Sequence, residues 1–394
     1  TDILIRGNEL KNLTLGSSEV MVLNGNVDGF RVLDNYVHDC DNIGIDAIGF
    51  EGVAPNDALD QTRNGLIARN TVERITAVEN PSYGGGASAG GIYVDGGRDI
   101  VVERNHVAFC DIGIEVASEH LGRVTSGITV RSNIVRYSLM AGLFIGGYNQ
   151  ESTGAADACL IAHNTFYNND TDPDDGTYGQ IYVQYRVTNT AFVSNILYHD
   201  IRKGGEYNAF IVQWNATGGA NTFDRNLYYG PDTPAFVMAN EWIEGFASYR
   251  ALALSGRSET WGDPRFVAPL CKDYTLRVDS PAINLGDGSF LTPGALDLRG
   301  HKRTHGAAPD AGAIEKDSEA PSAGSVSITL FEGWLALDFV VPEGFLYTLK
   351  AGRDLQTWAT VPGHDSEASE GRHAQMTLGP LGNAVRQFFK VCYE

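Results

Sequence analysis

The sequence predicts an all-β protein built from stacked turns, a β-solenoid, and three observations lead to that prediction. An asparagine recurs at steps that settle at 28 and then 31 residues, and a fixed period of this length is typical of solenoids. Each asparagine follows a short β-branched run, as in LIARNTV and ITVRSNIV. A second short run opens with glycine, as in GIYVDGG and GLFIGGY, without helical periodicity. The recurring asparagines are Asn8, Asn35, Asn70, Asn105, Asn133, Asn164, Asn195 and Asn226.

The asparagine itself suits such a turn. Its backbone tolerates the left-handed conformation that a tight corner needs. When turns stack, its side-chain amide can bond to the equivalent amide above and below. We therefore expect a ladder of asparagines that fixes which residues lie beside each other on neighbouring turns.

Composition limits the class of protein and its partners. The chain has 394 residues, 46 of them glycine, and a formal net charge of −20. This charge disfavours nucleic acid, anionic membranes and, without bound cations or a basic patch, polyanionic substrates. No apolar run is long enough to span a membrane. We expect a monomer that is secreted or periplasmic in a bacterium; no signal peptide opens this chain, and we expect upstream residues to have been removed.

Five cysteines are scattered along the chain, at positions 40, 110, 159, 271 and 392. An odd number without regular spacing predicts neither a complete disulfide framework nor a zinc site. Cys40 and Cys110 hold equivalent places two turns apart, about 10 Å at the spacing of stacked strands. Because a disulfide needs a shorter separation, we expect buried thiols that pack as small hydrophobic groups.

The regular turns extend over residues 1–230, about eight in all, each with one strand around the asparagine and one opening with glycine. Segments 75–90 and 168–178 are rich in Gly, Asp and Pro and predict long loops on the solenoid wall. Helix-like spacing is confined to 231–260, where we expect the regular coil to end.

The repeated Asn-containing turns resemble right-handed parallel β-helix proteins of the pectate-lyase-like superfamily. The resemblance covers residues 1–315, and the segment from 261 (WGDPRFVAPLCKDYTLRVDSPAINLGDG) resembles the closing segment of secreted bacterial members. It implies a β-helix over 1–315 with a closing segment from about 231. Residues 316–324 then form a linker, and 325–394 resemble a small β-sandwich module appended to secreted bacterial enzymes.

Alternation along the glycine-led strands predicts which side chains face outward. Aligning these strands gives three columns of outward-facing residues, one residue from each successive strand. The first is Asp46, Tyr93, Glu115, Phe144 and Tyr182; the second is Ile48, Asp95, Ala117, Gly146, Gln184 and Gln213; the third is Phe50, Gly97, Glu119 and Tyr148. Carboxylates beside aromatic rings provide the acceptors and apolar platforms that sugars require.

This face predicts paired-carboxylate chemistry on a polysaccharide or oligosaccharide. Asp95 and Glu115 lie diagonally on adjacent turns, with carboxyl groups about 5–8 Å apart, a range that spans retaining and inverting glycosidases. Clustered acids separate one another's pKa values, so we assign Asp95 as nucleophile or base and Glu115 as general acid. Asp46 or Glu119 would support them. Substrate contacts are expected from Tyr93, Phe144, Tyr148, Tyr182, Gln184 and Gln213.

Other interpretations of the same residues stay open. Each acid alone would ordinarily be a solvated surface residue. No cofactor is required, but Asp46, Asp95, Glu115 and Glu119 are also possible Ca²⁺ ligands. A calcium-assisted lyase would need a base, for which His120 is the candidate, and Arg98, Arg123 or Arg186 to neutralise a uronate. A glycan-binding adhesin without catalysis is the third alternative, and the sequence does not identify the sugar.

Overall fold

The computed structural model describes residues 2–172, 177–201, 208–214, 217–230, 233–252 and 258–316 and, after residue 316, the backbone of seven strands. The chain forms two compact units. The first comprises residues 1–264 and 281–315, and the second comprises residues 265–280 and 316–394.

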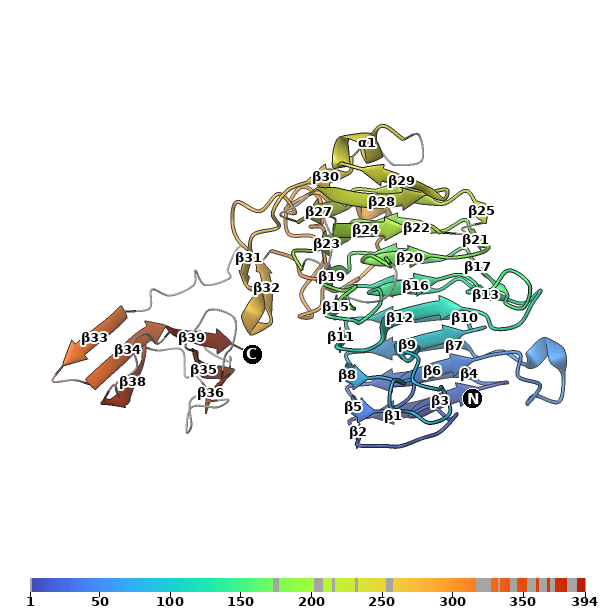
Figure 1. Cartoon of the computed structure of the whole chain (residues 1–394), viewed down its shortest axis with the longest axis horizontal. Helices are drawn as coiled ribbons and strands as arrows, with labels where there is room; N and C mark the ends of the chain where they lie inside the picture. Colours follow the sequence, from blue (N-terminus) through green and yellow to red (C-terminus); the bar gives the residue numbers. More distant parts are fainter. Residues whose placement is uncertain are drawn as a thin grey trace. The chain divides into compact units, whose positions relative to one another are not determined.

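The first unit is a parallel β-helix whose rungs stack in chain order (Figure 1). Three sheets form its walls, and every described neighbouring pair within them is parallel except β28 with β29. The strand pairing therefore confirms the all-β fold class and the parallel β-helix that the resemblance implies. No helix in the described part of the chain is long and apolar enough to span a membrane.

Each sheet takes one strand position from successive turns. Sheet A contains β1 (Ile3–Arg6), β4 (Asp28–Leu33), β7 (Arg63–Ala68), β10 (Arg98–Glu103), β13 (Val124–Ser126), β14 (Thr129–Arg131), β17 (Ala155–Asp157), β18 (Leu160–Ala162), β21 (Val187–Thr188), β22 (Ala191–Val193), β25 (Gly218–Gly219) and β26 (Thr222–Asp224). Sheet B contains β2 (Glu9–Lys11), β5 (Tyr36–Cys40), β8 (Thr71–Ile75), β11 (His106–Ala108), β15 (Ile134–Arg136), β19 (Thr165–Tyr167), β23 (Ile196–Tyr198), β27 (Leu227–Tyr229) and β30 (Thr260–Trp261). Sheet C contains β3 (Met21–Asn24), β6 (Ile45–Ile48), β9 (Gly90–Asp95), β12 (Ile112–Ala117), β16 (Leu143–Ile145), β20 (Ile181–Val183), β24 (Asn208–Val212), β28 (Pro234–Met238) and β29 (Glu241–Glu244).

A typical turn thus has three strand positions, which corrects the prediction of two. The single strand expected around each asparagine is divided into a sheet A strand before it and a sheet B strand after it. The division occurs because the residue before each asparagine has a positive φ, between 54° and 69°. These residues are Gly7, Asp34, Arg69, Arg104, Ser132, His163, Ser194 and Arg225. The prediction that the asparagine itself takes the left-handed conformation was wrong.

The asparagines form the expected ladder at the corner between sheets A and B. Each Nδ2 donates to Oδ1 of the asparagine on the next turn, at 2.9–3.1 Å from Asn8 through to Asn226. The backbone N–H of each donates to the same oxygen. The left-handed residue before each asparagine makes the corner, and the asparagine uses its side chain to fix the stacking.

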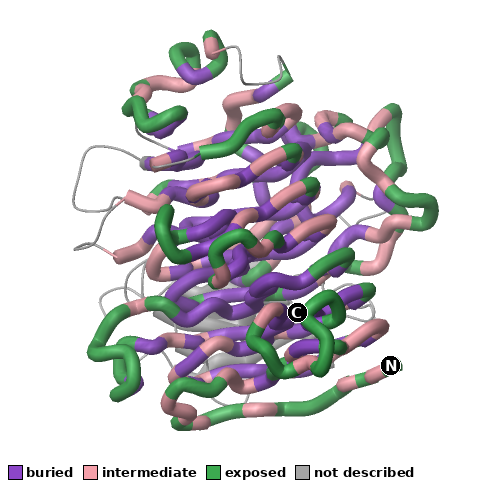
Figure 2. Tube along the Cα trace, turned by 90° about the vertical axis from the view of Figure 1, so that its right-hand side faces the viewer, coloured by how far each residue is buried: buried purple, intermediate pink, exposed green. Residues whose placement is uncertain are grey.

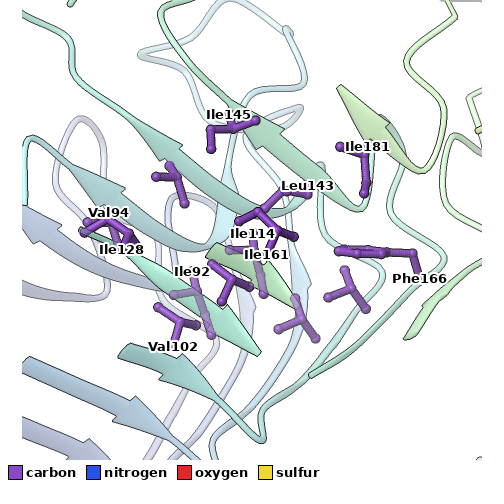
Figure 3. Close-up of a cluster of buried hydrophobic side chains, with 14 of the residues drawn as sticks. Ile92, Val94, Val102, Ile114, Ile128, Leu143, Ile145, Ile161, Phe166 and Ile181 are labelled. Atoms are coloured by element: carbon purple, nitrogen blue, oxygen red, sulfur yellow. The ribbon is translucent and has the colours of Figure 1, made fainter. Parts of the chain in front are cut away.

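The interior between the three sheets is apolar. Inward residues of sheet C, such as Ile92, Ile114 and Leu143, meet Val102 and Ile161 from sheet A, as Figure 3 shows. Nearly all of these side chains are completely buried. Along the rungs the chain is mostly buried, whereas exposed segments lie in the connections between them (Figure 2). Cys40, Cys110 and Cys159 are free, buried thiols, as predicted.

The ladder ends on a carboxyl group. Glu259 is 2% exposed, and its two oxygens accept hydrogen bonds from Nδ2 and the backbone N–H of Asn226 at 3.1 Å. The hydroxyl of Tyr249 also donates to it at 3.4 Å. Burial raises the pKa of Glu259 to about 8, so the carboxyl group is largely protonated at neutral pH. The short helix α1 (Phe246–Arg250) lies in this last part of the coil, where helix-like spacing was predicted.

Residues 281–315 fold back along the corner that carries the ladder. The backbone N–H of Gly312 donates to the carbonyl of Ser194 at 2.8 Å. Arg303, 2% exposed, donates to Nδ1 of His163 at 2.7 Å and to the carbonyl oxygens of residues 310 and 312 at 2.9 Å. The closing segment is therefore fixed to the coil by buried hydrogen bonds. A single 3₁₀ turn, η3 (Gly288–Phe290), lies within it.

The second unit is antiparallel in its described strands. β31 (Phe266–Ala268) pairs with β32 (Asp273–Leu276), and η2 (Pro269–Cys271) joins them. Two further sheets contain β33 (Ser327–Phe331), β34 (Trp334–Val340) and β38 (His373–Pro380), and then β35 (Leu346–Gly352), β36 (Ala359–Thr360), β37 (Glu367–Ala368) and β39 (Phe388–Tyr393). The linker predicted at 316–324 lies, from residue 317, outside the described residues. Cys271 is disulfide-bonded; the prediction of buried thiols was made from the spacing of Cys40 and Cys110.

Candidate functional site on sheet C

The outward face of sheet C carries the predicted acids in the predicted register. Asp46 on β6 pairs with Tyr93 on β9, which pairs with Glu115 on β12. The same column continues through Phe144 to Tyr182. In the second column Asp95 lies between Ile48 and Ala117. Asp46, Asp95 and Glu115 therefore lie on three consecutive strands, with Asp95 and Glu115 diagonal to each other.

These outward residues are buried, unlike the solvated surface acids that were the alternative interpretation. Asp46 is 2% exposed, Asp95 3% and Glu115 6%. The chain that follows β12 folds back onto them: the backbone N–H of Glu119 donates to Oδ1 of Asp95 at 2.8 Å. The Tyr93 hydroxyl donates to Oε1 of Glu119 at 3.5 Å. The carboxyl groups consequently lie in a low-dielectric environment in which their mutual repulsion is strong.

Burial changes the protonation of this group of acids. It raises the pKa of Glu115 to about 8, with further contributions from the charges of Glu119 and Asp95. Burial, followed by the charge of Asp95, raises the pKa of Asp46 well above its ordinary range. The pKa of Asp95 is also raised, by burial and by Glu119, but the N–H bond from Glu119 opposes that change. Burial and mutual repulsion therefore favour the protonated forms of these acids, whereas the hydrogen bond from the N–H of Glu119 favours the charged form of Asp95.

Two acids of this neighbourhood were not predicted. Glu51, three residues after Ile48 closes its strand, raises the pKa of Glu119 and Asp95 by its charge. Glu19, before β3, acts on Asp46 and Asp95 in the same way. Glu51 comes shortly after β6, as Glu119 comes shortly after β12. This similarity is visible in the sequence and could have predicted that Glu51 belongs to the same group of acids. The position of Glu19 depends on how residues 13–20 fold and leaves no such pattern.

His120 is held by one of these acids. Its Nε2 lies 2.8 Å from Oε1 of Glu51, and both side chains are more than one third exposed. The arginines proposed to neutralise a uronate are otherwise engaged. Arg123 donates to Asp57, in η1 (Asp57–Leu59), and lies over the ring of Phe50. Arg186 donates to backbone carbonyls and Arg98 pairs with its neighbour in sequence.

Aromatic residues occupy the turns on the C-terminal side of the acids. The ring of Phe144 lies 5.0 Å from that of Tyr182 and 5.5 Å from that of Tyr178, centroid to centroid. Phe144 is buried, whereas the two tyrosines are half-buried. Tyr148 is 52% exposed, and its pKa is raised by burial and by the charges of Glu119, Asp95 and Glu115. The face thus has an acidic part on β6, β9 and β12 and an aromatic part on β16 and β20.

The outer predicted positions have mixed outcomes. The third column is not continuous, because a Cβ on Gly97 would meet the inward side chains of Val94 and Ile100. Gln213 accepts a bond from the backbone of Ala239 at 3.4 Å, which makes it a support between turns. Gln184 is buried, and its Oε1 has no hydrogen-bond partner.

The acids do not form a preorganised metal site. Within the described residues, no group of three or more His, Cys, Asp or Glu side chains is arranged to hold a metal ion. The carboxyl groups act on one another through charge without converging on one point. The calcium alternative therefore stays a prediction.

The fold defines the class of protein as a parallel β-helix, and comparisons give its relatives. No protein-family model matches the chain. It is 40% identical over 281 residues to a Bacillus subtilis (strain 168) protein named uncharacterized protein YwoF. The match covers 71% of this chain and 58% of that protein, so the chain spans little more than half the length of this relative.

Among solved structures, the chain is similar to a pectate lyase, Pel9A, with 12% identity and a TM-score of 0.42, over 80% of this chain and 72% of that one. It is also similar to tailspike protein 2 of bacteriophage CBA120, with 10% identity and a TM-score of 0.36, over 98% and 64% of the two chains. A third is tailspike protein gp49 of the Acinetobacter baumannii bacteriophage Fri1, a capsular polysaccharide depolymerase, with 8% identity and a TM-score of 0.28, over 95% and 71%.

Proposed function

We propose that this protein is a secreted carbohydrate-active enzyme that hydrolyses glycosidic bonds on the outward face of sheet C. One observation carries the proposal: Asp46, Asp95 and Glu115 lie on three consecutive strands and are buried together beside an aromatic surface. Buried carboxyl groups in different protonation states are the groups that glycosidases use. The names of the structural neighbours include enzymes that act on polysaccharides.

The environment of each acid supports a division of roles. Glu115, with a pKa of about 8, retains a proton at neutral pH and would donate it to the glycosidic oxygen as the bond to the anomeric carbon breaks. Asp95 accepts a backbone N–H, which favours its charged form, and would attack the anomeric carbon or activate a water. Water supplies the new hydroxyl group, and its proton restores the acid. The charges of Glu119 and Asp95 would help burial to keep Glu115 protonated.

The aromatic part of the face supports a sugar-binding role. Phe144 and Tyr182, with the nearby Tyr148 and Tyr178, offer apolar ring surfaces, and Gln184 has an unused acceptor. A glycan that lies across successive turns would place one sugar beside the acids and the next sugars on the rings. A non-catalytic glycan-binding protein would use the same rings without needing the buried acids.

A polysaccharide lyase is a second candidate, and the contact between His120 and Glu51 favours it. A histidine oriented by a carboxylate can remove the proton next to a sugar carboxylate. This reaction also needs a positive charge to neutralise the uronate. The described arginines proposed for that purpose are bonded elsewhere, which favours the hydrolase.

A glycan panel with two readouts tests the proposal. We expect new reducing ends without ultraviolet absorbance, and turnover that is unchanged by a chelator. Absorbance from an unsaturated product would identify a lyase, and loss of turnover with the chelator would identify a bound metal. Binding without turnover on every glycan bound would contradict the enzyme proposal and favour the adhesin.

A further inference from the structure

The acidic part of the sheet C face has a surplus of negative charge that its own residues do not neutralise. The outward positions on β6, β9, β12, β16 and β20 include no lysine or arginine. Two basic side chains of the adjoining connections, His120 and Arg123, contact Glu51 and Asp57 respectively. The acids that act on one another by charge are Asp46, Asp95, Glu115, Glu119, Glu51 and Glu19.

Two buried acceptors on this face lack a donor. Oδ1 of Asp46 has no hydrogen-bond partner, although the side chain is 2% exposed. Oε1 of Gln184, a residue that is 7% exposed, also has no hydrogen-bond partner. Leaving a buried acceptor unsatisfied costs about 1–3 kcal/mol, and more for a charged group. A ligand that brings hydrogen-bond donors to this face would remove that cost.

The chemistry of these acceptors narrows the choice of ligand. A compact metal ion needs several ligands that converge on one point, and no described group of His, Cys, Asp or Glu does so. A sugar hydroxyl can donate one hydrogen bond but leaves the charge surplus unchanged. A protonated amine has three donors, no acceptor and a positive charge. The rings of Tyr93 and Tyr148, which lie near the same acids, are also favourable neighbours for a cation.

We propose that the glycan bound on sheet C carries a free amino group, and that this protonated amine binds beside Asp46 among the acids. This inference rests on the proposed function, because it names the substrate class of the same site. Asp46 acts as a specificity-determining residue. The chemical form of the sugar that the site rejects is the N-acetylated one, because acetylation removes the charge and replaces donors by an acetyl group.

The proposal also predicts an exchange of protons. The acids that face Asp46 come from β9, β12 and the connections around β3 and β6, and burial keeps part of this group protonated. A bound ammonium group favours their charged forms, so binding must release protons into solvent. A neutral glycan would not produce this release.

Matched oligosaccharides test the inference. We would measure, by calorimetry, binding of glucosamine and galactosamine oligomers in α and β linkage and of their N-acetylated counterparts. For at least one pair we expect the amine form to bind tenfold or more tightly, with proton release detected by comparing two buffers. Asp46→Asn should bring the ratio close to one while binding of the acetylated partner is retained. Glu9→Gln, on sheet B, is the control and should keep the ratio of the wild type.

The outcomes separate this inference from the proposed function. The amino-sugar inference is wrong if the acetylated forms bind as tightly as the amine forms or more tightly, or if no pair binds. It is also wrong if Ca²⁺ alone binds and Asp46→Asn abolishes that binding. Turnover of a neutral or acidic glycan without a preference for amines would leave the hydrolase standing and overturn only the inference. If Asp46→Asn does not fold, the same binding ratio is measured for Glu115→Gln, together with proton release in the wild type. A ratio unchanged in Glu115→Gln and binding without proton release would then contradict the inference.

Discussion

Replacing Asn133 by alanine should destabilise the coil far more than the same replacement at Asn8. The Asn133 side chain makes four hydrogen bonds: it accepts the N–H and Nδ2 of Asn105 at 2.8 and 3.0 Å and donates to the Val102 carbonyl and Asn164 Oδ1 at 2.9 Å. Asn133 is 0% exposed, so water cannot replace these bonds. At about 1 kcal/mol for each bond, with a further cost for the N–H of Asn105, we expect a loss of about 3–5 kcal/mol.

Asn8 provides a matched control because it stands at the open end of the same ladder. It is exposed, and its side chain makes a single bond, to Oδ1 of Asn35 at 2.9 Å. Asn8→Ala should cost less than about 1 kcal/mol. Urea unfolding followed by circular dichroism measures both, and hydrogen exchange at the amide of Asn105 locates the effect. Equal losses for the two variants would refute the view that the buried ladder stabilises the stacking.

Three further predictions concern buried polar groups. Glu259 has an unfolded pKa near 4.5 and a folded pKa of about 8, so stability from this group is complete below pH 4.5 and is lost as pH rises to about 8. Glu259→Gln should flatten that part of a plot of stability against pH, and an unchanged slope would contradict the assignment. Asp46→Asn should make the fold more stable at alkaline pH while lowering turnover, because burial and the charges of neighbouring acids raise the pKa of Asp46 and oppose its charged form; a loss of stability at alkaline pH would contradict this. Arg303→Met should lose about 2–4 kcal/mol and expose residues 281–315 to proteolysis, whereas Arg31→Met, at an exposed pair, should do neither.

The register of the site was predictable because parallel stacking repeats one corner from turn to turn. Once the asparagines fix that corner, alternation along the strands places Asp46, Tyr93 and Glu115 in one column, and the pairing agrees. Prediction succeeded there because it needed only a period and the two-residue alternation of a strand.

Prediction failed where the chain leaves this repeat. The left-handed residue that splits each predicted strand is a Ser, His, Arg, Asp or Gly, so residue type gave no signal. The burial of Asp95 depends on how the residues after β12 fold back, which no periodicity describes. Gly97 faces inward because β9 ends at Asp95 and the chain turns before β10.

Turnover of carboxyl variants tests the central claim most directly. On a glycan cleaved by the wild-type protein, we would measure kcat for Asp95→Asn, Glu115→Gln and the sheet B control Glu9→Gln. We predict losses of about 100-fold or more for the first two, the usual contribution of an acid or base, and wild-type turnover for the control. Wild-type turnover in both Asp95→Asn and Glu115→Gln would contradict the assignment of catalysis to this face.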